Sequence, residues 1–359
     1  MSESASFGRM WCCAVAALLF LARVAAAQPA IVVDEQTQAG IQRALNALHG
    51  PGTVILPAGR YQIDGTLIIR DDGVTLQGSG ADADQTVLFR VADGTNTAMV
   101  RSTGHAQVRV TGIRFEGASV RDPELGELSS GREVGVLLEN AVDFRVDHSF
   151  FTHTGFAGVR TNGASAGVVD HCTFEDQFKP AVGTDGYGVV VYGVDALEGE
   201  PFGSGRATFI EDSSFSLCRH AVASNKGARY VFRNNYVAQN EIAHAVDAHG
   251  TEYGSLVGTE WIDVHDNLIE DPIYRGYAVL IRGGKGLIWN NTFVGYNLGV
   301  RLTRTTSEPT GPVHIWDNTL VPDTSPMVRA DQDSTYSLSP PADYVPYPYP
   351  HPLAAAAPR

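Results

Sequence analysis

The sequence predicts an all-β fold, a single-stranded parallel β-helix with a short N-terminal capping helix. Three observations predict it: a six-residue pattern that recurs along the chain, a second column of small residue–valine pairs, and an amphipathic segment near the N-terminus. The 359 residues are 43% hydrophobic, which is enough for a large core. Only 18% are charged, against roughly 25% in an average soluble domain.

The recurring pattern reads apolar, polar, His/Asp/Asn, Ser/Cys/Asn, any residue, apolar. Its fourth position falls at Ser149, Cys172, Ser213, Asn235, Asn267, Asn291 and Asn318. The shortest intervals are 22 to 24 residues, and a repeat of that length with occasional insertions is typical of a stacked solenoid. Stacked strands lie about 4.8 Å apart. We therefore expect the four asparagines to form an internal ladder in which each amide bonds to the next.

The second column places a small residue before a valine in each unit. Its members are Gly135-Val136, Gly158-Val159, Gly188-Val189, Ala221-Val222, Ala245-Val246, Ala278-Val279 and Gly299-Val300. Each unit therefore holds at least two short strands, and neither strand can bury its apolar side alone. A chain that coils so that each strand stacks on its counterpart in the next unit buries a continuous core, which is the architecture of a parallel β-helix.

The N-terminal part fits the same fold. Apolar residues recur at helical spacing in residues 36–48 (Ile41, Ala44, Leu45, Leu48). A helix here would cover the exposed edge of the first coil. The segments 50–61, 67–69 and 73–80 that follow resemble the opening of the pectin-lyase-like, right-handed β-helix superfamily. The resemblance extends over roughly residues 31–322. It implies a right-handed β-helix but selects no chemistry, because that superfamily includes lyases, hydrolases, epimerases and binding proteins.

The two ends of the chain differ from the repeats. Residues 1–27 read as a signal peptide: Arg9 precedes a short apolar run, and Ala25 to Ala27 form a small-residue cleavage site. We expect a β-helix domain over 28–339 in a secreted or periplasmic protein. The Pro/Tyr-rich tail, 340–359, either packs along the flank of the helix or is disordered, and 354–359 should be loose.

Charge narrows the range of partners. The formal net charge is −14, and the chain has three lysines, Lys179, Lys226 and Lys285. A basic footprint for nucleic acid is absent, and the apolar run in the leader is too short for a membrane span. We expect a monomer whose partner is a polysaccharide or oligosaccharide, with no nucleic acid and no membrane span after the leader is removed.

In a β-helix the interior is core, so function must lie outside. Side chains alternate along a strand, and the first and third residues after each valine should face outward. These are Arg160 and Asn162, Val190 and Tyr192, Ala223 and Asn225, Asp247 and His249, Leu280 and Arg282, and Arg301 and Thr303. A further set precedes each small residue, and strict alternation turns it inward unless it lies at a bend: Tyr187, His220, His244 and Tyr277.

This face has the groups needed for β-elimination on uronic acid polymers. The reaction removes the C5 proton next to a carboxylate, so it needs a base, an acid for the departing oxygen, and a group that offsets the carboxylate charge. We expect Lys226 as base and His249 as acid or alternative base. Asn225 and Arg282 would neutralise the carboxylate, and Asp247 would orient His249 or hold a cation. The substrate-binding residues would be Arg160, Tyr192, His220, Arg229, His244, Tyr277 and Arg301.

Residues 224–235 resemble the lysine-containing strand of the alginate lyase and chondroitinase B family. The resemblance implies that Lys226, seven residues before Arg233, is the base. That family places an arginine acid about one coil later, whereas residues 244–250 here read HAVDAHG. His249 or His244 would have to act instead.

Three other functions remain open. A glycoside hydrolase needs two carboxyl groups that face one bond, and only Asp247 lies clearly on the face, with possible partners near its edges in Asp185, Asp195, Glu252 and Asp271. A uronate epimerase would use nearly the same residues as a lyase. A non-catalytic carbohydrate-binding or structural β-helix is the third.

No metal site is expected from the sequence. Asp247, His249, His244 and His220 could contribute ligands, but only the first two are confidently outward, and two ligands are too few. Calcium has no clear ligand set, so the cofactor stays unassigned.

Overall fold

The computed structural model describes residues 28–355 except 83, 93–96, 120–131, 178–184, 239–242, 253, 273–274 and 305–308. The predicted signal peptide, 1–27, lies outside the described residues, as do 356–359 of the tail. No helix in the described ranges has the length and apolar character needed to cross a membrane.

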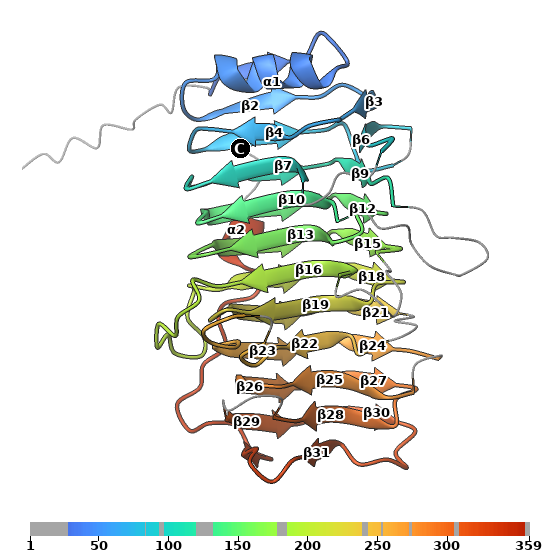
Figure 1. The fold of residues 1–359 in the computed structure, drawn as a ribbon, viewed down its shortest axis with the longest axis vertical. Coiled ribbons are helices and arrows are strands. Elements are labelled where there is room, and N and C mark those ends of the chain that lie inside the picture. The colour runs from blue at the N-terminus through green and yellow to red at the C-terminus, as the bar shows by residue number, and fades with distance from the viewer. Residues whose placement is uncertain are drawn as a thin grey trace, which may run out of the picture.

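Three parallel sheets form the walls of the molecule, and its coils stack along the long axis in Figure 1. Sheet A comprises β1 (Ala30–Val32), β2 (Gly52–Ile55), β5 (Val74–Gln77), β8 (Arg109–Thr111), β11 (Val142–Asp147), β14 (Ala166–Asp170), β17 (Thr208–Glu211), β20 (Arg229–Arg233), β23 (Trp261–His265), β26 (Gly284–Trp289), β29 (Thr310–Trp316) and β32 (Tyr336–Ser337). Sheet B comprises β3 (Gly59–Gln62), β6 (Thr86–Phe89), β9 (Arg114–Glu116), β12 (Phe150–Thr152), β15 (Thr173–Glu175), β18 (Ser214–Ser216), β21 (Tyr236–Ala238), β24 (Leu268–Glu270), β27 (Thr292–Val294) and β30 (Thr319–Val321). Sheet C comprises β4 (Leu67–Ile69), β7 (Ala98–Thr103), β10 (Val134–Glu139), β13 (Ala157–Asn162), β16 (Tyr187–Tyr192), β19 (His220–Asn225), β22 (Val246–Ala248), β25 (Tyr277–Ile281), β28 (Leu298–Leu302) and β31 (Val328–Ala330).

Consecutive strands of each sheet come from consecutive coils. In sheet A, for example, β11 pairs with β14 and β14 with β17, always in parallel. Each coil therefore supplies one strand to each wall, and the apolar sides of the three walls meet in one continuous core. This topology confirms the predicted parallel β-helix, and it adds a third strand per coil to the two that the sequence columns revealed.

The six-residue pattern is the turn from sheet A to sheet B. Its third position adopts a left-handed backbone in all seven copies, with φ between 48° at His148 and 56° at Asp266. Asn, Asp and His tolerate that region better than other residues with a side chain, which explains the His/Asp/Asn column. The fourth position points inward and forms the expected ladder: the amide of Asn235 donates to Asn267 (3.1 Å), Asn267 to Asn291 (2.9 Å), and Asn291 to Asn318 (2.9 Å).

The small residues of the second column lie at bends in sheet C, as Gly188 shows in β16. A Cβ added at Gly188 would lie 2.6 Å from Cδ1 of Phe215, so this position faces the crowded interior. Val189, the next residue, is in the core as well. Because two successive residues face inward, Tyr187 before them is turned outward.

The capping helix is confirmed. Helix α1 (Gln38–Ala47) has Thr37 as its N-cap residue, and the Thr37 hydroxyl accepts a hydrogen bond from the Gly40 amide (3.0 Å). Its buried side includes Ile41 and Leu45. The helix closes the N-terminal end of the stack, above β2 and β4 (Figure 1). It thereby covers backbone that would otherwise be an open edge.

The tail packs along sheet A and ends in the short helix α2 (Pro352–Ala355). The Tyr344 hydroxyl donates to Asp263 (2.6 Å), and the ring of Tyr347 lies 4.6 Å from that of Phe209. Arg233 donates to the carbonyl oxygens of Tyr347 and Pro348 (2.7 and 2.8 Å). Of the two sequence-based alternatives, the structure shows packing along the flank. Ala354 and Ala355, which were expected to be loose, belong to α2, and 356–359 lie outside the described residues.

We expect acid to weaken this attachment through His351. Burial first, and then the Arg233 charge, lower the pKa of His351 from 6.5 to about 4. The unfolded chain therefore binds an extra proton below about pH 6.5, so stability falls as the pH drops from there to about 4. The expected loss is on the order of 2 kcal/mol, since one pKa unit is worth about 1.4 kcal/mol and the site is incompletely buried. Urea unfolding of the wild type and His351→Gln across this range measures it. Parallel stability curves for the two proteins would contradict the prediction.

Candidate functional site

The outer face of sheet C aligns the predicted site residues in register. Arg160 pairs with Val190, then Ala223, Asp247, Leu280 and Arg301 follow in successive coils. The expected alternation is present: Val189 and Val191 belong to the central core, whereas Val190 packs in a separate outer cluster with Phe156 and Tyr187. The register on which the functional interpretation depends is therefore confirmed.

The residues before the small column also face outward and stack in one row. Ring centroids are 5.7 Å apart for Tyr187 and His220, 4.3 Å for His220 and His244, and 5.2 Å for His244 and Tyr277. The sequence left their direction open, and the bend at the small residue settles it. Two more imidazoles are thereby added to the face that carries Asp247.

Asp247 is the centre of a charged cluster. Its Oδ2 atom lies 2.5 Å from Nη2 of Arg282 and 3.0 Å from Nε2 of His249. Glu252 closes the cluster from the other side, 2.7 Å from Nη1 of Arg282 and 3.1 Å from Nδ1 of His249. Two carboxylates thus hold one guanidinium and one imidazole in fixed positions.

Burial and neighbouring charge act in opposite directions on these groups. Burial alone would raise the pKa of Asp247, but His249, His244 and Arg282 outweigh it and hold that pKa well below its usual range. Burial would lower the pKa of His249, yet Asp247 and Glu252 raise it. Burial dominates at His220 and His244 and lowers the pKa of both. Asp247 is therefore a carboxylate that favours the protonated form of His249, and it lies beside two imidazoles whose neutral form burial favours.

The cluster is more deeply buried than an exposed sheet face would be. Asp247 and His220 have no exposed surface, and His249 is only 7% exposed. The insertion after His249 contributes to the burial of His249, because its Glu252 lies against Arg282 and His249. Glu252 was named only as a possible carboxylate at the edge of the face. The sequence feature that could have placed Glu252 in the site is its position three residues after His249, inside an insertion.

Two adjoining pockets lie on the same face and share Tyr192 and Lys226. The first, of about 200 Å³, is lined among others by Arg132, Asn225 and His249. The second, of about 410 Å³, is lined by Arg160, Asn162 and Asp195 among others. A hollow of about 460 Å³ at the last coils is larger, but no Lys, Arg or His lines it.

Lys226 has an unusual backbone for its residue type. It directly follows β19 and has φ 62°. The corresponding residues after β10 and β13 are Asn140 and Gly163, also at positive φ, and both types are common there. Lysine is not, and such backbone positions gather at functional sites. Within the described residues, its ammonium group has no ion-pair partner.

Five of the seven predicted substrate-binding residues line neither pocket: His220, His244 and Tyr277 belong to the row of stacked rings, and Arg229 and Arg301 lie farther away. Arg229 is on sheet A, not sheet C, and pairs with Glu260 (3.0 Å) and Glu198 (2.7 Å). It was placed near Lys226 by sequence distance, but the turn after Lys226 carries the chain to another wall. Arg301 is on sheet C, two coils beyond Asp247, where it pairs with Asp331 (2.5 Å).

Arg282 lies on the predicted face, but its guanidinium is already paired with two carboxylates of the protein. Its guanidinium is engaged by Asp247 and Glu252, so it is not available to neutralise a substrate carboxylate. The pocket has other cations that the sequence reasoning did not assign to the site. Arg132 borders the first pocket and pairs with Asp185 (2.8 Å). Its only signal in the sequence was its place at the end of a long insertion.

No protein-family model and no curated protein matches the chain. Solved structures do. The chain is similar to a polygalacturonase from Erwinia carotovora ssp. carotovora (13% identity, TM-score 0.58, covering 88% of this chain and 97% of that one). It is similar to an alginate lyase from Paenibacillus sp. str. FPU-7 (12%, 0.55, 85% and 99%). A mannuronic acid specific polysaccharide family 6 lyase from human gut microbiota also matches (13%, 0.55, 85% and 83%). At these identities the likeness shows the fold alone, a right-handed parallel β-helix.

Proposed function

We propose that the protein is a carbohydrate-active enzyme, a lyase that cleaves uronate-containing polysaccharide by β-elimination. The observation that carries the proposal is the pair of adjoining pockets that share Lys226 and Tyr192. Arg132 borders one pocket and Arg160 the other. A sugar chain laid across both would place consecutive residues on either side of Lys226.

The roles follow from what the reaction requires. Lys226 would take the C5 proton, since it borders both pockets and is the half-buried amine of the face. His249 lines the first pocket and hydrogen-bonds with carboxylates on both ring nitrogens. It would donate the Nδ1 proton to the departing glycosidic oxygen once that oxygen takes the place of Glu252. Asn225 lines the same pocket and would bind the substrate carboxylate together with Arg160 of the adjoining pocket.

The charged partners disfavour hydrolysis. A hydrolase needs one carboxyl group as acid and a second as base or nucleophile. Asp247 and Glu252 are both held by Arg282, and Asp185 is held by Arg132. Such pairing stabilises the ionised form of a carboxyl group and leaves a poor proton donor. Among the described residues, Lys226 at the pocket has no ion-pair partner, and in its neutral form an amine can take a proton next to a carboxylate.

The structural neighbours support an activity on carbohydrate. The alginate lyase and the polygalacturonase have names that refer to uronate polymers. An exported protein would meet such polymers outside the cell, and residues 1–27 stay the predicted export signal.

The test is incubation of the purified protein with alginate, pectate, glycosaminoglycans and glucuronan. A lyase produces a C4–C5 double bond, and its ultraviolet absorbance should rise on at least one polymer. The carboxyl-reduced form of the same polymer is the matched control, because without the carboxylate the C5 proton is not acidic enough to leave. New reducing ends without that absorbance would overturn the lyase in favour of a hydrolase. Inversion at C5 without cleavage, seen by NMR, would indicate an epimerase, and binding without either change a non-catalytic protein.

A further inference from the structure

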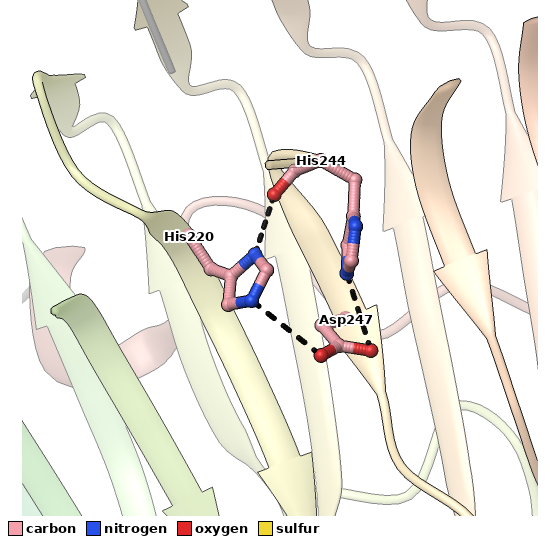
Figure 2. A group of neighbouring side chains, drawn as sticks. All are labelled: His220, His244 and Asp247. Atoms are coloured by element: carbon pink, nitrogen blue, oxygen red, sulfur yellow. Dashed lines mark hydrogen bonds and ion pairs between the residues drawn. The ribbon is translucent and has the colours of Figure 1, made fainter. Parts of the chain in front are cut away.

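We propose that His220, His244 and Asp247 form a binding site for a divalent transition-metal ion such as Zn²⁺. The three side chains converge on the outer face of sheet C in Figure 2. They come from two neighbouring coils, His220 from the start of β19 and the other two from the beginning of β22 and the residues just before it. Their ligand atoms all lie within 4.8 Å of one another.

The hydrogen bond of His220 fixes which ring nitrogen is free. Nδ1 of His220 lies 2.6 Å from the carbonyl oxygen of His244. A carbonyl can only accept, so Nδ1 carries the proton and Nε2 presents a lone pair. That Nε2 atom is directed at the Asp247 carboxylate, 3.6 Å from Oδ2 (Figure 2). Histidines that bind metals usually have this arrangement, with the second ring nitrogen donating to a carbonyl or carboxylate.

Without a cation the arrangement is unfavourable. Nε2 of His220 and Nε2 of His244 are both buried and make no hydrogen bond of acceptable geometry within the described part of the chain. A buried polar atom without a hydrogen-bond partner destabilises the folded chain. In addition, the lone pair of His220 faces the negative charge of Asp247 across 3.6 Å. A cation between these atoms would satisfy both imidazoles and the carboxylate.

The distances suit a small tetrahedral ion. Zinc binds His and Asp at about 2.0–2.2 Å, which separates neighbouring ligand atoms by roughly 3.4 Å. The distance from Nε2 of His244 to Oδ1 of Asp247 is 3.3 Å, and that from Nε2 of His220 to Oδ2 is 3.6 Å. Imidazole and carboxylate ligands favour zinc and its neighbours over magnesium and calcium. Three ligands leave a fourth position for water or a substrate atom.

Arg282 and His249 also face Asp247 and have to be considered. Arg282 contacts both carboxylate oxygens, Oδ2 through Nη2 and Oδ1 through Nε (3.2 Å), and His249 contacts Oδ2. Each also contacts Glu252, at 2.7 and 3.1 Å, so part of their charge is offset there. From the sequence we expected no metal site, because strand alternation placed only two of the four ligand residues on the outer face. The bend that turns His220 and His244 outward removes that objection.

A second cluster on the chain provides a comparison. Asp147, His148 and Asp170 also lie within reach of one ion. Arginines hold the carboxylates in both clusters, Arg109 and Arg145 here and Arg282 at Asp247. The clusters differ in their imidazoles, since the His148 side chain is 58% exposed. No unsatisfied imidazole points into that cluster, so we assign it no metal.

The experiment measures metal content directly. Tag-free protein is stripped with chelator, equilibrated with Zn²⁺, desalted and analysed by elemental mass spectrometry. We expect about one zinc per chain, lost in His220→Gln and His244→Gln and retained in the matched control His148→Gln. Cobalt in place of zinc should give the visible spectrum of a tetrahedral site in the wild type and the control alone.

Substoichiometric zinc in the wild type, or undiminished zinc in both site variants, would overturn the proposal. Circular dichroism shows whether the variants fold. If the variants do not fold, the wild type alone decides the question. Zinc must then raise its unfolding temperature, and cobalt in place of zinc must give the spectrum of a tetrahedral site. Neither readout depends on catalytic activity, so the result is independent of the lyase assignment.

Discussion

Replacing Lys226 with methionine should reduce kcat on the cleaved polymer by on the order of 10²–10⁴-fold, the usual contribution of a general base. Methionine keeps the length of the side chain and removes the amine. KM should change little, because Arg132, Arg160 and Tyr192 still line the pockets. Initial rates over a range of polymer concentrations measure both constants.

Two further variants separate chemistry from structure. Lys285→Met removes an exposed lysine on β26 of sheet A and should leave activity unchanged. Lys226→Asn places at φ 62° a residue that tolerates the left-handed region, as Asn140 does in an earlier coil. It should fold at least as stably as the wild type and still be inactive. Full activity in either Lys226 variant would show that another residue is the base.

Replacing Arg233 with alanine should destabilise the protein by about 3–5 kcal/mol, the cost of removing one partner of a buried ion pair. Arg233 has no exposed surface, and its guanidinium lies 2.7 Å from Glu211. The variant would leave that buried carboxylate without its counter-ion. It would also remove the donors that bind the tail carbonyls of Tyr347 and Pro348. Urea unfolding measures the first effect, and limited proteolysis of the tail the second.

Arg60→Ala is the matched control, because its partner pair is at the surface. Arg60 lies 2.7 Å from Glu116, but its side chain is 51% exposed. Surface pairs contribute about 1 kcal/mol or less, so this variant should unfold near the wild type. The double variant Arg233→Met/Glu211→Gln should recover part of the loss, since it leaves no unpaired charge. A tail equally resistant to protease in Arg233→Ala would mean that the aromatic contacts hold it alone.

The fold could be predicted because its determinants are local and repeat in every coil. The third position of the turn pattern requires a left-handed backbone, as at His171 and Asn290, and the fourth requires a ladder side chain, as at Asn267 and Asn291. Each coil repeats the same requirement, so the signal accumulates along the chain. Helix α1 was predictable for a similar reason, from apolar spacing within ten residues.

The site was predictable only in part. The valine column set the register, and this correctly brought Asp247, His249 and Arg282 together. Arg229 was misplaced, since the turn that carries it to sheet A has no repeated sequence signal. The ion pairs of Arg282 with Glu252 and of Arg132 with Asp185 were not predicted. Both involve insertions, which follow no period.

The sequence by itself determined the walls of the molecule, because a repeating strand-and-turn code has one way to bury its apolar side. Only the tertiary structure decided which polar groups on the outer wall are paired and which are free. His220 is an example. It stacks on neighbouring rings, bonds to the His244 carbonyl oxygen and approaches Asp247. These contacts join different coils, and they depend on the bend that turns the His220 side chain outward. Side-chain pairing depends on distances between segments far apart in the chain, and no local pattern encodes those distances.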